Sequence, residues 1–267
     1  MRSWINGIET DKISIVNRSL QFGDGFFTTF PCLNGKIQFL KNHFQRLFLS
    51  EKKLLFKRIN FSALYAEVKF ASKCISSGII KIIIIRGNSV RGYKTSQCAE
   101  PVRIIILTEN YLNFKKIKKK GANLYYSPIK IPRNPLLSGI KHNNKIEQIL
   151  ASIHLEKSKK DEAIILDRKG FIVECCACNI FWRKNNFVFT PSLKYCGVPG
   201  IIRKKIINIL PKLGYKVIIS FFKRHDVILA EEVFITNSII SIIPVRIIDN
   251  QHFYKRTLFN KIRNFFW

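Results

Sequence analysis

Long apolar runs are absent from this sequence of 267 residues. A helix needs about 20 consecutive apolar residues to span a bilayer, whereas the most apolar stretch, residues 79–87, is short and interrupted by Lys81. The first 14 residues also lack the apolar core and the small-residue cleavage site of a secretory signal. No long polar low-complexity tract occurs, and 47% of the chain is hydrophobic. We therefore expect a folded, cytoplasmic protein that is not bound to a membrane.

A disulfide framework and a cysteine-based metal site are also missing. The seven cysteines are odd in number and irregularly spread, which is typical of a chain from a reducing compartment. Cys175, Cys176 and Cys178 lie close together, but no CxxC pair or clustered histidine completes a tetrahedral set. On a strand, Cys175 would face opposite to the other two. We expect packed, inert thiols and no metal.

Acidic side chains are few: 17 Asp and Glu stand against 46 Lys and Arg, so the formal net charge is +29. This charge suits a module that binds nucleic acid or an anionic surface, and that class stays open as an alternative. However, the lysines are scattered through every segment together with an excess of Ile, Asn and Phe, whose codons are rich in A and T. The one local concentration is residues 114–121, and the sequence does not clearly interleave basic clusters with aromatic residues. We attribute the charge to composition and expect neither nucleic acid nor membrane as a partner.

The hydrophobic pattern predicts an α/β chain of the α+β type. Helical spacing of apolar residues predicts helices over residues 37–56, 61–75, 144–157 and, after a turn, within 197–214, with a short one at the end of the chain. Runs rich in β-branched residues predict strands over residues 79–87, 102–109, 122–131, 215–222, 231–238 and 242–249, with several more within 162–191. The side of helix 144–157 that is expected to pack on the core carries Ile146, Ile149, Leu150 and Ile153.

The lysine-rich segment divides this pattern into two parts. We expect a small α+β domain over residues 1–112, a connection over residues 113–120 and a larger strand-rich domain over residues 121–267.

Lys141 stands out because it precedes an apolar helical pattern. Burial disfavours the charged form of an amine, which lowers its pKa and makes it a usable nucleophile. A lysine that only extends its stem along apolar surface at the start of a helix is the competing interpretation.

Three further features could bind an anion or balance a cation. Residues 198–200, Val-Pro-Gly, precede a helix, so the amides of Ile201 and Ile202 would point outwards as an anion site, although ordinary helix starts look similar. Ser238, in a Thr-Asn-Ser sequence that ends a strand, could close such a site or simply form a turn. Glu174 lies among apolar strand residues and therefore calls for a cationic partner.

Together these motifs resemble one family. The segments are NRSLQFGDGFFTTF, NHFQRLFLS, RGNSVRGY, SGIKHNNKIEQILA, DEAIILDRKGFIVECCACNIFW, GVPGIIR and TNSIISIIPV. In this order they resemble the fold type IV pyridoxal-phosphate enzymes, which include branched-chain and D-amino-acid aminotransferases and the aminodeoxychorismate lyases. The resemblance runs from Asn6 to about Val245 and is greatest to the lyases.

The resemblance implies a cofactor, pyridoxal 5'-phosphate, held between the two domains. Lys141 would bind its aldehyde covalently, and Glu174 would pair with its pyridine nitrogen. The groups implied for the phosphate are Arg46, the amides of Ile201 and Ile202, and the hydroxyl of Ser238.

The resemblance also implies substrate contacts. Thr29 falls where the lyases carry a threonine near the substrate, and Arg91 and Tyr93 lie in a loop that could reach substrate carboxylates. Two departures stand out: Asn17 replaces the aspartate of many members, and Thr28 replaces a glutamate common in the aminotransferases.

The implied function is conversion of 4-amino-4-deoxychorismate to 4-aminobenzoate and pyruvate in folate biosynthesis, carried out by a homodimer. An amino-acid aminotransferase of the same fold is the alternative within this family.

Overall fold

The computed structural model describes residues 1–109 and 115–266, which form two units. The first unit comprises residues 1–112 and 141–144, and the second comprises residues 113–140 and 145–267. The short segment of residues 141–144, expected within the larger domain, thus packs with the smaller unit.

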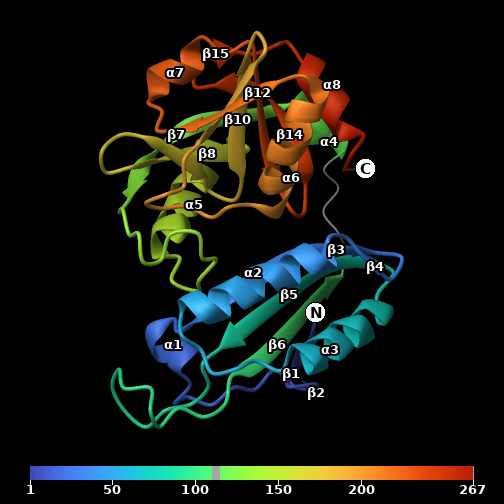
Figure 1. Ribbon diagram of the computed structural model, residues 1–267, viewed down its shortest axis with the longest axis vertical. Helices are drawn as coiled ribbons and strands as arrows, with labels where there is room; N and C mark the ends of the chain where they lie inside the picture. The colour runs from blue at the N-terminus through green and yellow to red at the C-terminus, as the bar shows by residue number, and fades with distance from the viewer. Residues whose placement is uncertain (110–114, 267) are drawn as a thin grey trace. The chain divides into compact units, whose positions relative to one another are not determined.

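The first unit is an antiparallel sheet with helices on one face (Figure 1). Its six strands run in the order β2-β1-β6-β5-β3-β4. The strands are β1 (Arg2–Ile5), β2 (Ile8–Glu9), β3 (Gly25–Leu33), β4 (Lys36–Ile37), β5 (Ser77–Ile85) and β6 (Val102–Glu109). The helices are α1 (Arg18–Phe22), α2 (Leu40–Lys53) and α3 (Phe61–Lys73), of which α2 and α3 cover the sheet (Figure 1). Phe26 and Phe30 of β3 and Ile82 of β5 are fully buried beneath them.

Helix α2 is shorter than expected, because β4 occupies the start of the predicted segment and Phe39 adopts a left-handed conformation at the helix N-terminus. Its buried face carries His43 and Leu47, whereas Phe48 is 42% exposed.

The second unit is a mixed sheet of nine strands in the order β12-β11-β10-β13-β14-β7-β8-β9, with β15 beside β14. Its strands are β7 (Ala122–Ile131), β8 (Glu162–Asp167), β9 (Ile172–Cys175), β10 (Asn179–Lys184), β11 (Phe187–Pro191), β12 (Lys216–Ser220), β13 (Glu232–Asn237), β14 (Ser241–Ile248) and β15 (Gln251–His252). Its helices are α4 (Lys115–Lys120), α5 (Ile146–Ser158), α6 (Ile201–Ile209), the 3-10 helix η1 (Leu210–Leu213), α7 (Arg224–Ile228) and α8 (Thr257–Arg263). None of the helices in the described ranges is long and apolar enough to cross a membrane.

The predicted connection over residues 113–120 is helical where the structure describes it. Residues 115–120 form α4, and Ile117 packs against the main core of the second unit. Residues 113 and 114 lie outside the described residues.

The expected core face of α5 is exposed. Ile146, Ile149, Leu150 and Ile153 are 65, 53, 44 and 43% exposed, so the prediction that they pack on the core is wrong. The helix instead buries Ala151, which lies in a cluster with Ile131 and Ile165. A small side chain lets the helix approach the sheet closely, and an apolar pattern alone does not reveal which side will do so.

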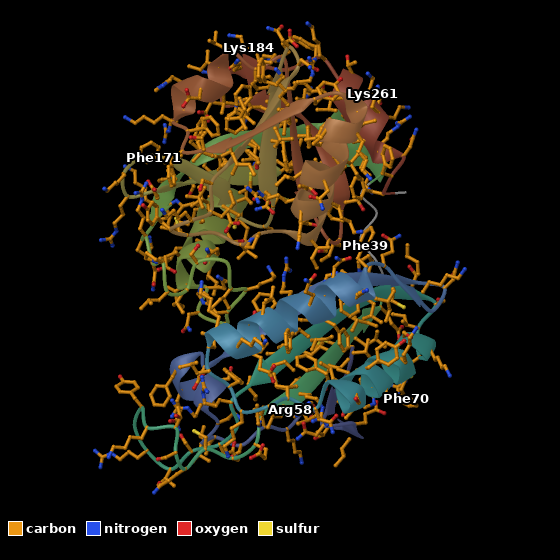
Figure 2. The ribbon with its side chains drawn as sticks, in the orientation of Figure 1. Phe39, Arg58, Phe70, Phe171, Lys184 and Lys261 are labelled. Atoms are coloured by element: carbon orange, nitrogen blue, oxygen red, sulfur yellow. The ribbon has the colours of Figure 1, made fainter. Side chains whose placement is uncertain are left out.

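Basic side chains extend from well-separated elements. Lys184 at the end of β10 and Lys261 on α8 both reach outwards from the surface of the second unit (Figure 2).

Candidate active site

Lys141 lies in an extended segment beside the start of β3, not at the start of a helix as the sequence suggested. Its carbonyl accepts a hydrogen bond of 2.9 Å from the amide of Phe27, and Asn143 donates to the carbonyl of Gly25 over the same distance. Helix α5 begins only at Ile146. This pairing places Lys141 opposite Phe27, and its Nζ lies 4.7 Å from the centroid of the Phe27 ring.

The two threonines of β3 point to opposite faces of the sheet, because successive strand residues alternate. Thr28 is fully buried, and its Oγ1 lies 2.6 Å from Nδ1 of His43. Thr29 is partly exposed and shares the face of Phe27. The replacement of glutamate by Thr28 therefore affects the packing around His43, and Thr29 is the threonine on the side of Lys141.

His43 was not among the predicted site residues. It is fully buried on α2, and its pKa falls to about 3 because burial, and then the charges of Arg46 and Lys141, disfavour the imidazolium. No group in the described ranges forms a hydrogen bond with its Nε2. A neutral histidine thus lies near two of the predicted site residues, and only the fold could reveal this.

A buried ionic cluster supports the loop that carries Arg91 and Tyr93. Asp24 accepts hydrogen bonds from Nε of Arg18 at 2.8 Å and Nε of Arg86 at 2.9 Å. Arg18 also donates to the carbonyls of Gly92 and Tyr93 at 2.9 and 3.3 Å. Arg91 is exposed and Tyr93 is 82% exposed, so the structure fixes the backbone of this loop more firmly than these side chains.

Asn17 forms the N-cap of α1, although the resemblance would lead one to expect aspartate at this position. Its side chain caps α1 by accepting a hydrogen bond of 2.9 Å from the amide of Ser19. An asparagine oxygen serves as well as a carboxylate in this position.

In the second unit, Glu174 is 7% exposed and held by neutral donors. Its Oε2 accepts hydrogen bonds from the amide of Val198 at 2.9 Å and from Nδ2 of Asn179 at 3.4 Å. Burial lowers the pKa of Lys145 and lowers that of Arg203 to about 10, and the carboxylate of Glu174 opposes both shifts. Lys145 and Arg203 therefore lie close enough for their charges to interact with Glu174, and the predicted cationic partner of Glu174 stays a prediction.

The N-terminus of α6 has the features of an anion site. Within the described part of the chain, the N-cap residue Gly200 gives no side-chain cap to the helix, whose first residues are Ile201 and Ile202. The preceding Gly200 donates from its amide to Oδ1 of Asn179 at 2.9 Å. Asn179 therefore links this helix start to Glu174, which are two parts of the predicted cofactor site.

Ser238 lies in the turn between β13 and β14. A turn at the end of a strand was one of the two interpretations that the sequence left open for this residue. Asn237 orders this turn by accepting hydrogen bonds from the amides of Ile239 and Ile240. It also donates to the carbonyl of Ala177 at 3.2 Å, which ties the turn to the bend that follows β9 and Glu174.

The expected facing of the cysteines is confirmed for Cys175 and Cys176, which lie on opposite sides, and is wrong for Cys178. Cys175 and Cys178 both belong to the main core of the second unit, whereas Cys176 packs on the cluster around Ala151. The reason is that β9 ends at Cys175, so the alternation of a strand does not continue. Burial raises the pKa of all three thiols, to about 12 for Cys176, which is consistent with unreactive thiols.

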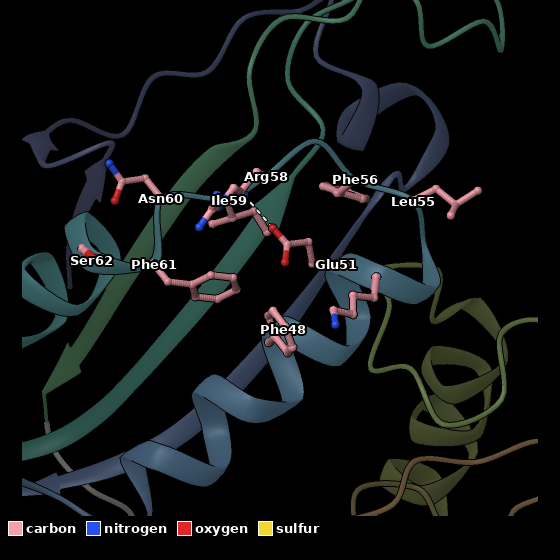
Figure 3. Close-up of a pocket in the computed structure, with 10 residues that line it drawn as sticks. Phe48, Glu51, Leu55, Phe56, Arg58, Ile59, Asn60, Phe61 and Ser62 are labelled. Atoms are coloured by element: carbon pink, nitrogen blue, oxygen red, sulfur yellow. Dashed lines mark hydrogen bonds between the residues drawn. The ribbon is translucent and has the colours of Figure 1, made fainter.

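A pocket of about 780 Å³ opens on the first unit between the end of α2 and the start of α3 (Figure 3). Phe48, Phe61 and Arg58 line it, and Glu51 accepts a hydrogen bond of 2.6 Å from the amide of Ile59 there (Figure 3). The pocket contains none of the predicted site residues.

Comparison with known proteins yields one family. The family described as "Amino-transferase class IV" matches residues 25–248. The aminodeoxychorismate lyase of Vibrio harveyi is 32% identical over 245 residues, which cover 91% of this chain and 89% of that protein. The branched-chain-amino-acid aminotransferase of Escherichia coli K12 is 26% identical over 270 residues, which cover 92 and 84%. The crystal structure of 4-amino-4-deoxychorismate lyase from Pseudomonas aeruginosa matches with a TM-score of 0.92 and 27% identity, and covers 98% of this chain and 97% of that one.

Proposed function

The chain belongs to the class IV aminotransferase family, and from this premise we propose that it is a lyase that converts 4-amino-4-deoxychorismate to 4-aminobenzoate and pyruvate. The proposal is carried by Lys141, an amine held over Phe27 by strand pairing in a chain whose similarity to an aminodeoxychorismate lyase extends over 91% of its length. We further propose that the enzyme is a homodimer, that it lies in the cytoplasm and that it acts in folate biosynthesis.

The residues present fit pyridoxal 5'-phosphate. The second unit offers a buried carboxylate, Glu174, suited to a protonated pyridine nitrogen. It also offers the uncapped amides of Ile201 and Ile202, suited to a phosphate. We assign Arg46 and Ser238 to the same phosphate and Lys141 to the aldehyde. When bound, the cofactor supplies a cationic ring that accepts the electrons of a broken C–H bond.

The remaining chemistry falls to the chain itself. Lys141 would act as the base that takes the proton from the ring carbon that bears the amino group of the substrate. Glu174, fixed by Val198 and Asn179, keeps the pyridine nitrogen protonated throughout. The C–O bond to the enolpyruvyl group then breaks and the ring becomes aromatic. The released enolpyruvate takes up a proton to give pyruvate, so the reaction needs no second substrate. Thr29 lies on the face of Lys141, and we assign it to the substrate.

Product analysis tests this function. Purified enzyme incubated with 4-amino-4-deoxychorismate and no oxo-acid should release 4-aminobenzoate and pyruvate in equal amounts. The variant Lys141→Ala should release neither, while Lys157→Ala, which removes an exposed lysine of α5, should retain full activity. Turnover that strictly requires an oxo-acid would instead establish the aminotransferase, which the similarity to the Escherichia coli enzyme keeps as the second candidate.

A further inference from the structure

Asn179 is the first residue of β10 and follows the bend that comes after β9 and Glu174. It is 5% exposed, and both polar atoms of its side chain form hydrogen bonds. Its Nδ2 donates to Oε2 of Glu174 at 3.4 Å and to the carbonyl of Val198 at 3.0 Å. Its Oδ1 accepts a hydrogen bond of 2.9 Å from the amide of Gly200. One amide group therefore contacts the carboxylate on one side and the backbone that leads into α6 on the other.

Two glycines allow this close contact. Gly200 lies so near Oδ1 of Asn179 that a Cβ atom on the glycine would collide with that oxygen. Gly197 has a φ of +92°, and a Cβ atom there would lie 2.8 Å from Cγ1 of Val173 and 3.5 Å from Cδ of Glu174. The segment from Gly197 to Gly200 is thus packed directly against Glu174 and Asn179, with no room for a side chain at either glycine.

The start of α6 has a second anchor. Arg203, in the first turn of the helix, is 8% exposed and donates hydrogen bonds to the carbonyl of Pro191 at 2.9 Å and to Oγ1 of Thr190 at 3.3 Å. These bonds attach the helix to the end of β11. The helix should therefore stay in place when the side chain of Asn179 is removed, and what is then lost is the link between the helix start and Glu174.

We propose that Asn179 is a positioning residue that sets the separation between the carboxylate of Glu174 and the first amides of α6. The inference rests on the proposed function, which assigns the pyridine nitrogen of the cofactor to Glu174 and its phosphate to the amides of Ile201 and Ile202. The ring and the phosphate belong to one small molecule, so the two groups that bind them must keep a defined separation. Donation from Nδ2 of Asn179 also favours the ionised form of Glu174, which is the form that pairs with a protonated nitrogen.

The experiment measures binding of pyridoxine and of pyridoxine 5'-phosphate to the full-length protein freed of cofactor, by calorimetry. Both compounds carry the ring nitrogen but no aldehyde, so neither reacts with lysines, and only the second carries the phosphate. Asn179→Ala should weaken binding of pyridoxine about fivefold, because Glu174 loses a donor, and binding of pyridoxine 5'-phosphate about twentyfold or more, because the phosphate contacts are also misplaced. Asn179→Asp keeps the shape but replaces the donor with an acceptor beside Glu174, so it should bind both compounds at least as weakly.

The matched control is Asn123→Ala, in the same unit. Oδ1 of Asn123 accepts hydrogen bonds from Nε and a terminal nitrogen of Arg246 at 3.1 and 3.0 Å, so this variant also loses hydrogen bonds made by an asparagine. Asn123 pairs with Ile247 towards the far end of β14 from the turn that carries Ser238. The control should change the affinity for neither compound.

Two results would overturn the inference even if the lyase reaction proceeds. Equal weakening of the two compounds by Asn179→Ala would mean that Asn179 serves the ring alone, and unchanged binding of pyridoxine would mean that it only supports the helix start. If Asn179→Ala does not fold, Asn179→Asp gives the same test, because it keeps the shape of the side chain.

Failure of the proposed function gives different results. A wild type that requires an oxo-acid for turnover, but shows the predicted dependence of both affinities on Asn179, would refute the lyase and support the positioning role. A wild type that binds neither compound would refute the cofactor assignment and the positioning role together.

Discussion

Replacing Asp24 by asparagine removes the one negative charge that two guanidinium groups share. The side chains of Arg18 and Arg86 are 5 and 13% exposed, and that of Asp24 is 16% exposed. Loss of one partner from a buried ion pair costs about 3–5 kcal/mol, because the other charge stays buried. Arg86 keeps its hydrogen bonds to the carbonyls of Leu54 and Leu55, so we expect the lower end, about 3 kcal/mol.

Hydrogen exchange of the β3 and β5 amides as urea is added measures this loss in the unit that contains Asp24. The matched control is Glu9→Gln, which breaks the pair between Glu9 and Arg2, also 2.8 Å long but with side chains that are 52 and 40% exposed. Solvent-exposed pairs contribute little, so the control should leave the free energy of unfolding nearly unchanged. Equal losses in the two variants would refute the argument that burial sets the strength of the Asp24 cluster.

Three further predictions concern the cofactor, pH and a helix cap. Glu174→Gln should lower kcat about a hundredfold, because a neutral amide cannot hold a pyridine nitrogen protonated. The circular dichroism spectrum should stay native, since the amide of Val198 keeps a hydrogen-bond acceptor. An unchanged kcat would contradict the role assigned to Glu174. His43 has a folded pKa of about 3, below its unfolded value, so the unfolded chain gains the proton and the free energy of unfolding falls as pH drops below about 6.5. His43→Gln should flatten that fall, by up to about 1.4 kcal/mol per pH unit, in urea titrations, and parallel curves would be the contrary result. Asn17→Ala should cost about 1 kcal/mol and Asn17→Asp almost nothing in the same titrations, so equal losses would exclude capping.

Much of the fold follows from local pattern. Strands β6 and β7 have the predicted bounds, because β-branched runs between turn residues specify both ends. The predicted α+β fold of type IV is confirmed by the family match and by the Pseudomonas aeruginosa structure. The two-residue strands β2 and β4 contain too few residues to show a period, so the sequence could not indicate them.

Site residues that stand in a recognisable sequence motif could be predicted. Residues that reach the site only through contacts between distant segments could not. Lys141 and Glu174 stand in recognisable segments, and their roles stay predictions. His43 gains its significance from a contact between distant segments, because α2 brings it to Thr28 of β3. Such contacts depend on tertiary packing that no local pattern encodes.

The central claim is that Lys141 carries the cofactor. Borohydride reduction of the enzyme loaded with pyridoxal phosphate fixes any imine to lysine, and peptide mapping by mass spectrometry then locates the modified residue. We predict a pyridoxyl group on Lys141 at one per chain. A label on Lys81 or Lys145 with Lys141 unmodified, or no label at all, would contradict it.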